Sequence, residues 1–180
     1  TLQEAADLYL ESGKQRSPRT DEGLRGSLRL HLRDWLEKPL AEISRKMVYD
    51  RHQRIGKKVG RYAANNAMRS FRAIYNRAMK QHEDLPLNPI INIVWFSEYS
   101  RDASIPAEQL ADWYTGIRKL GNPVRVDYYQ FILFSGLRRR SAAEMRWEHI
   151  DIEKGTLLIP NPKGGAKRAF VLPLSDFLIE

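Results

Sequence analysis

The stretch FILFSGLRRRSAAEMRWEHID, residues 131–151, decides how the second half of the chain is organised. An apolar run over 128–134 ends at Ser135 and Gly136, and three consecutive arginines follow: Arg138, Arg139 and Arg140. A buried helix that ends at a glycine places the next residues at a surface bend. An arginine there has rigid apolar backing and faces outward. Its guanidinium could clamp a phosphate through two hydrogen bonds.

Composition narrows the class of protein. The chain has 180 residues, of which 42% are hydrophobic, so it can form one or two domains with real cores. A net charge of +8 and a pI of about 9.8 favour a polyanionic partner. The absence of cysteine excludes disulfides and thiolate-bound metal, and no apolar run approaches the ~18 residues of a membrane span. We expect a cytoplasmic protein with no membrane partner.

The positive charge is concentrated between Ser44 and Lys80. This segment holds eleven lysines and arginines and one acid, Asp50, so its charge of about +10 exceeds that of the whole chain. The rest of the chain is therefore acidic on balance. A basic segment within an otherwise acidic chain indicates where a polyanion would bind.

Four helices are expected in the first half. Thr1 and Glu4 have the spacing of a capping box before the first helix. Pro18 breaks that helix, and a second is predicted over about 20–35, with a buried stripe. Ser44 is the expected N-cap of a third helix that runs to about Lys58, where Gly56 and Gly60 indicate its end. The fourth covers about 61–81 and is the most periodic. The apolar exit that follows, with Trp95 and Phe96, is expected to pack in the core.

Two helical faces are candidates for nucleic-acid binding. On the second helix Arg25, Arg29 and Arg33 recur every fourth residue and share one face. Such a row can straddle a duplex backbone or form an ordinary solvated face, and the sequence favours neither. On the fourth helix the face opposite the core carries five polar residues and no acid: Asn65, Arg69, Arg72, Asn76 and Lys80. Solvated helices usually mix signs, so this face is better explained by phosphates and base edges.

The second half combines helices with a small sheet. Residues 97–104 are polar and aperiodic, as in a linker, and two helices are expected between Pro106 and Ser135. After Trp147 the pattern changes to short strands over 150–152, 156–159 and 168–172, with a loop between the last two. The fold class is therefore mostly α, with a small antiparallel sheet or hairpin near the end.

The arginine stretch resembles the tyrosine recombinases, the integrases of phages and genomic islands. Their motif Thr-Gly-Leu-Arg-Arg-x-Glu, followed by Leu-Arg-Trp-x-Asp-Ile-Asp, is matched here by SGLRRRS at 135–141 and MRWEHID at 145–151. The resemblance implies that Arg138 is the catalytic arginine that grips the scissile phosphate. Ser141 replaces the family's glutamate, which we interpret as supportive and not chemical. Arg139 is a further candidate for DNA contact.

The same resemblance assigns a lysine in the loop. Pro162-Lys163-Gly164-Gly165 and the following LPLS at 172–175 match the family's hairpin in order and spacing. Lys163 is thereby implied to be the general acid for the 5′-hydroxyl leaving group, and Lys167 is the competing candidate that also counts as a DNA contact. The helices of residues 1–96 are similar to the family's four-helix, SAM-like core-binding domain. Residues 97–180 then form the first part of a truncated α+β catalytic domain.

The resemblance also implies a function. A complete enzyme of this type cuts and rejoins duplex DNA through a phosphotyrosine, works without metal or other cofactor, and assembles as a tetramer on DNA. All eight tyrosines precede Lys163, and the family's nucleophile follows the hairpin, so we expect this chain to lack cleavage activity. The alternative is a non-enzymatic, sequence-specific or architectural DNA-binding protein derived from the same fold.

Overall fold

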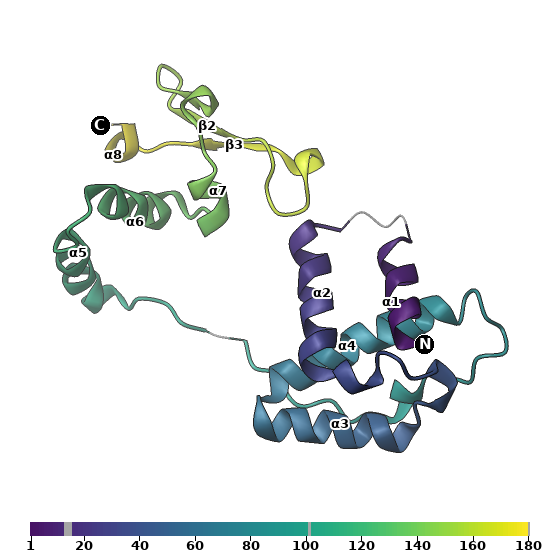
Figure 1. Cartoon of the computed structure of the whole chain (residues 1–180). Helices are drawn as coiled ribbons and strands as arrows, with labels where there is room; N and C mark the ends of the chain where they lie inside the picture. The colour runs from purple at the N-terminus through teal and green to yellow at the C-terminus, as the bar shows by residue number, and fades with distance from the viewer. Residues whose placement is uncertain (13–15, 101, 180) are drawn as a thin grey trace. The chain divides into compact units, whose positions relative to one another are not determined.

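The computed structural model describes residues 1–12, 16–100 and 102–179. The chain forms two compact units, Thr1–Arg101 and Asp102–Glu180 (Figure 1). The sequence predicted the boundary between the two domains after residue 96. The first unit extends further because residues 96–99 hydrogen-bond back to its helices.

The first unit contains four helices: α1 (Leu2–Leu10), α2 (Pro18–His31), α3 (Arg45–Lys58) and α4 (Arg61–Ala78). Short 3-10 turns lie at Arg33–Trp35, Leu40–Glu42 and Pro89–Asn92. The predicted capping box of Thr1 and Glu4 is present, and Ser44 caps α3 by accepting a hydrogen bond from the Met47 N–H. The four expected helices are confirmed.

The ends of α2 differ from the prediction. This helix begins at Pro18, two residues earlier than expected, because Ser17 accepts the N–H of Thr20 and Pro18 suits the first helical position. It ends at His31, and Trp35 lies in the 3-10 turn that follows. The predicted stripe still points inward, since Leu28, Leu32 and Trp35 are buried.

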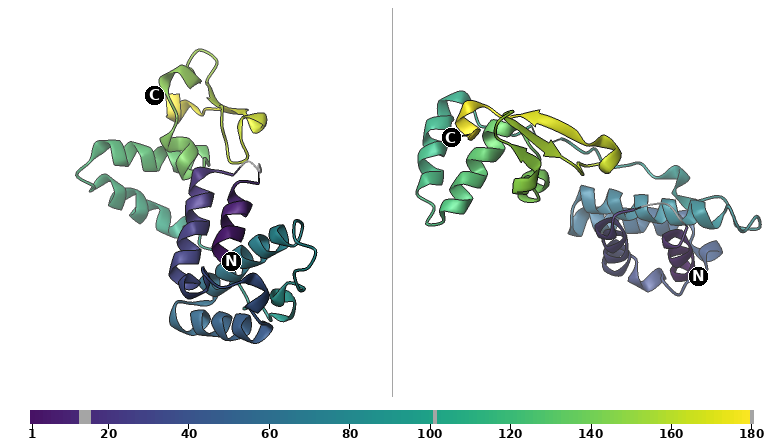
Figure 2. Two further views of the ribbon diagram at one scale, coloured as in Figure 1. Left: turned by 45° about the vertical axis from the view of Figure 1, so that its right-hand side comes forward. Right: turned by 90° about the horizontal axis from the view of Figure 1, so that it is seen from above.

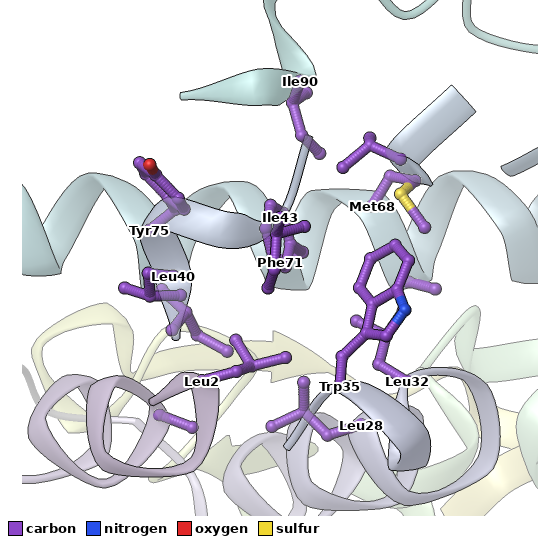
Figure 3. Close-up of a cluster of buried hydrophobic side chains, with 14 of the residues drawn as sticks. Leu2, Leu28, Leu32, Trp35, Leu40, Ile43, Met68, Phe71, Tyr75 and Ile90 are labelled. Atoms are coloured by element: carbon purple, nitrogen blue, oxygen red, sulfur yellow. The ribbon is translucent and has the colours of Figure 1, made fainter. Parts of the chain in front are cut away.

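Helix α4 is the central element of the first unit. It packs against α1, α2 and α3, and Figures 1 and 2 show α1 and α2 side by side across it. Figure 3 shows the shared core, in which Phe71 of α4 meets the edge of Trp35 at a centroid distance of 6.0 Å. Burying each such large side chain contributes about 1.5–3 kcal/mol. The exposed face of α4 is therefore held on a rigid base.

The second unit contains helices α5 (Leu110–Arg118), α6 (Pro123–Ser135), α7 (Arg139–Ala143) and α8 (Asp176–Ile179). Its 3-10 turns are Ala107–Gln109, Trp147–His149 and Ala166–Arg168. Strands β1 (Ile150–Asp151), β2 (Thr156–Ile159) and β3 (Phe170–Pro173) form an antiparallel sheet in that order, with Leu157 opposite Leu172. Figure 2 shows β2 and β3 alongside one another. The mostly α fold class with a small antiparallel sheet is confirmed.

Candidate nucleic-acid interface

The outer face of α4 carries most of the predicted basic residues. Arg69, Arg72 and Asn76 are exposed on this helix, as expected. Lys80, which was predicted within the helix, is exposed in the turn that follows Ala78. Asn76 accepts a hydrogen bond from the side chain of Asn88 at 2.7 Å, so its amide oxygen is already engaged. The described part of α4 contains no acid, and the face is cationic along its length.

Trp95 lies beneath two of these arginines. The guanidinium carbons of Arg69 and Arg72 lie 5.7 and 5.3 Å from the centre of its indole ring. Trp95 also packs against the core of the first unit, as the sequence predicted. Its second role was missed: the ring is a platform that restricts where both guanidinium groups can lie.

The prediction that Asn65 lies on the exposed face is wrong. Asn65 has no exposed surface. Its amide group donates to the Phe96 carbonyl at 2.8 Å and to the Glu98 carboxylate at 2.7 Å, and its oxygen accepts the Phe96 N–H at 3.2 Å. The amide therefore joins α4 to the segment after the bundle and is not available to read bases. Helical spacing placed Asn65 outside because the segment that covers it lies about 30 residues later in the chain.

Glu98 is a residue of this face that the sequence did not reveal. Its carboxylate contacts Arg69 twice, at 2.9 and 3.1 Å, and accepts the Asn65 amide. The hydrogen bond from Arg69, followed by that from Asn65, holds the pKa of Glu98 below its ordinary value. The cationic face thus carries one anion, supplied by a different segment of the chain.

The remaining predicted basic residues differ in accessibility. Arg25, Arg29 and Arg33 are all exposed, and Arg25 lies 3.7 Å from the carboxylate of Asp7 on α1. Arg51, one of the eleven cations of the basic segment, is instead buried. It donates to the carboxylate of Asp34 at 2.8 Å, and its guanidinium lies 4.4 Å from the ring centre of Trp35. Arg51 therefore stabilises the fold and does not enlarge the cationic surface.

Arg138 occupies the bend that the sequence predicted. Gly136 ends α6 in the left-handed conformation, with a φ of 65°, which glycine adopts without strain. Leu137 is buried, and Arg138 follows as the exposed residue that precedes α7. In the described part of this region, the ion pairs join Arg140 to Glu144 and Arg146 to Glu148, and leave Arg138 out. Its backbone is thus anchored while its side chain faces solvent.

Lys163 lies in the loop that joins β2 to β3. Pro162 is buried, Lys163 is exposed, and the next two residues, Gly164 and Gly165, have φ values of 110° and 90°. Lys167 lies in the 3-10 turn that leads into β3, and it is also exposed. The loop starts just after Ile159, which shares one hydrophobic cluster with Leu137. Arg138 and Lys163 therefore extend from two segments that are anchored in the same small core.

Ser141, at the position where the resembling motif has a glutamate, is half-buried on α7. Within the described ranges, no group of three or more histidine, aspartate or glutamate side chains is arranged to hold a metal ion. No helix in those ranges is long and apolar enough to cross a membrane.

Comparison with known proteins identifies the fold. No family model matches the chain. The prophage integrase IntF of Escherichia coli K12 is 30% identical over 79 residues, which are 44% of this chain and 16% of that protein. Several solved structures align with nearly all of the chain, and two different integrases bound to DNA are among them. One is the Tn1549 transposon integrase in complex with transposon right end DNA, with a TM-score of 0.77 and 17% identity. The alignment covers 62% of that integrase chain.

A solved structure of a lambda integrase tetramer bound to a Holliday junction aligns with the chain at a TM-score of 0.80 and 17% identity. The chain is therefore similar to one integrase in sequence over part of its length, and to two others in fold over nearly all of it. The alignment covers 97–99% of the integrase-like chain but only 53–62% of these two solved integrases.

Proposed function

We propose that this integrase-like chain is part of a site-specific recombinase, which binds duplex DNA and cuts and rejoins it through a phosphotyrosine. The helical unit acts as the core-binding domain, and the second unit supplies the first residues of the catalytic site. The lambda relative is described as a tetramer on a Holliday junction, which supports the same assembly for the intact enzyme.

The position of Arg138 is the observation that carries the proposal. Its guanidinium follows a glycine bend and a buried leucine, and no described acid neutralises it. A guanidinium held in this way donates hydrogen bonds to the non-bridging oxygens of a phosphate. It would thereby stabilise the charge that develops when the phosphorus is attacked.

The proposed cleavage step needs a tyrosine as the nucleophile and Lys163 as the general acid. A tyrosine oxygen forms a bond to the scissile phosphorus, and the bond to the 5′-oxygen breaks. Lys163 donates a proton to that oxygen as it leaves, and the 3′-phosphate remains on the tyrosine. All eight tyrosines precede Lys163. We therefore expect the 180-residue chain to bind DNA and to leave both strands intact.

DNA binding is tested by titrating the 180-residue chain with a labelled duplex at several salt concentrations. Each phosphate that is neutralised contributes about −0.9 to the slope of log K against log salt. The double change R69E/R72E is expected to weaken binding to any duplex and to make the slope less negative. R118E/K119E applies the same charge change to two exposed residues at the end of α5, outside the basic segment, and serves as the matched control. Affinity that does not depend on salt would contradict the proposal.

A further inference from the structure

Glu98 and Arg69 form a bidentate ion pair on the cationic face of α4. Two nitrogens of Arg69 meet the two carboxylate oxygens of Glu98, at 2.9 and 3.1 Å. A carboxylate that engages a guanidinium through both oxygens uses the same donors that a phosphate would use. Glu98 thus occupies the phosphate-binding side of an arginine on the cationic face of α4.

The source of this carboxylate is also informative. Residues 61–81 contain no acid, so α4 offers no anion of its own for Arg69. Glu98 comes from the segment that follows the bundle, and this segment is fixed by its own contacts. Phe96 stacks on His52 with a ring-centre distance of 4.4 Å, and the Tyr99 N–H donates to the Tyr62 hydroxyl at 2.8 Å.

We propose that Glu98 is a resident substitute for a DNA phosphate, which binds Arg69 in the free protein and is displaced when DNA occupies the face of α4. This inference rests on the proposed DNA binding. Glu98 then lowers the affinity for DNA, because each complex must first break the contact between Glu98 and Arg69.

The surrounding contacts allow such an exchange. The side chains of Arg69 and Glu98 are 49% and 27% exposed, so an incoming phosphate can reach the guanidinium. Trp95 still supports Arg69 after the carboxylate leaves. Asn65 loses one of its two acceptors but keeps the other, the Phe96 carbonyl. A phosphate near Glu98 would repel the carboxylate and favour its departure.

The first test compares Glu98→Gln with Glu83→Gln. Both changes remove one negative charge, and Glu83 is an exposed acid beyond the end of α4. Glutamine at 98 still accepts from Asn65 but no longer pairs with Arg69. We expect E98Q to bind a duplex about two- to fivefold more tightly than E83Q at low salt. In an R69A background the two variants should bind equally.

Each result of this test decides a different point. If the wild-type chain does not bind DNA, the proposed function fails. If it binds but E98Q gains no more than E83Q, only the role of Glu98 is contradicted. A gain that persists without Arg69 would show a general effect of charge and would likewise overturn the inference.

The second test uses the wild-type chain and does not depend on the folding of a variant. The pKa of Glu98 can be followed by carboxyl NMR in the absence and presence of saturating duplex. In the free chain it should lie below the ordinary value because Arg69 donates to the carboxylate. On DNA it should rise, since that donor is lost and phosphates lie nearby. A pKa that stays low with DNA bound would show that Glu98 remains on Arg69.

Discussion

The imidazole Nε2 of His52 on α3 lies 2.8 Å from the side-chain oxygen of Asn65 on α4, and neither residue has any exposed surface. The same amide also holds the backbone of Phe96. One asparagine thus joins α3, α4 and the segment around Phe96. Its role is to complete the fold of the first unit.

Replacing this asparagine should therefore affect stability. Asn65→Ala leaves the backbone groups of Phe96 and the imidazole of His52 without a partner, and should lower the free energy of unfolding by about 2–3 kcal/mol. Asn66→Ala, at the exposed neighbouring position, should change it by less than about 0.5 kcal/mol. Urea unfolding measures the free energy of unfolding of both variants. Equal, small effects would mean that the buried network contributes nothing.

A glycine in α3 permits the same segment to pack. A β-carbon at Gly56 would lie 2.4 Å from an atom of the Phe96 ring, although Gly56 is within the helix. Gly56→Ala should therefore destabilise the unit by about 1–3 kcal/mol, despite the higher helix propensity of alanine. The comparison is Gly23→Ala on α2, where nothing lies within 4 Å and a gain of about 0.5–1 kcal/mol is expected. Thermal unfolding measures the Tm of both variants. A Tm of G56A above that of the wild type would contradict the close contact between Gly56 and Phe96.

These two positions show what the sequence could and could not reveal. The helices were predictable because caps and apolar periodicity are local, as at Ser44 and along α4. The predicted end of α3 at about Lys58 is confirmed, but the close approach of Phe96 to Gly56 was not predictable. Asn65 and Glu98 were misplaced or missed for the same reason. Their partners come from a segment about 30 residues away, and periodicity within one helix contains no information about it.

Among the candidate catalytic residues, the bend before Arg138 was predictable from the sequence, whereas the choice between Lys163 and Lys167 was not. The bend before Arg138 was predictable because Ser135-Gly136 after an apolar run is a local signal, and Gly136 does adopt the left-handed conformation. Whether the loop brings Lys163 or Lys167 to a phosphate depends on bound DNA. Spacing along the chain does not decide between these two exposed lysines.

The contact between Asp34 and Arg51 predicts how stability depends on pH. The hydrogen bond from Arg51 holds the pKa of Asp34 below its ordinary value of 3.8 in the folded state. The stabilisation is therefore fully present above about pH 4 and is lost as pH falls through the lowered pKa. In Asp34→Asn this contribution is missing at every pH. The difference in unfolding free energy between wild type and D34N should be largest at neutral pH and shrink in acid.

The control for this experiment is Asp50→Asn. It removes a carboxylate from an exposed pair with Lys46, whereas Arg51 is buried beside Trp35. D50N should have a smaller effect than D34N at neutral pH, because exposed helical pairs contribute little. A difference for D34N that stays constant from pH 7 to pH 2 would show that the carboxylate is not coupled to Arg51.

Arg138 should be essential for strand cleavage and dispensable for binding. In the intact enzyme, Arg138→Ala should reduce the rate of covalent complex formation by at least about 10²–10³, because a donor to the developing charge is lost. DNA affinity should change by only a few fold. Arg140→Ala is the matched control, since Arg140 is already paired with Glu144. Normal cleavage of a suicide substrate by R138A would contradict the assignment.

Lys163 can be distinguished from Lys167 by the chemistry of the leaving group. An alkoxide leaves slowly unless it is protonated, whereas a thiolate is a far weaker base and leaves without an acid. In the intact enzyme, Lys163→Ala should slow cleavage of ordinary DNA about 10²–10⁴-fold. Its rate should return close to that of the wild type when sulfur replaces the bridging 5′-oxygen. Lys167→Ala should show no such rescue. If K167A is rescued and K163A is not, Lys167 is the general acid; if K163A is slow with both substrates, Lys163 positions the DNA and donates no proton.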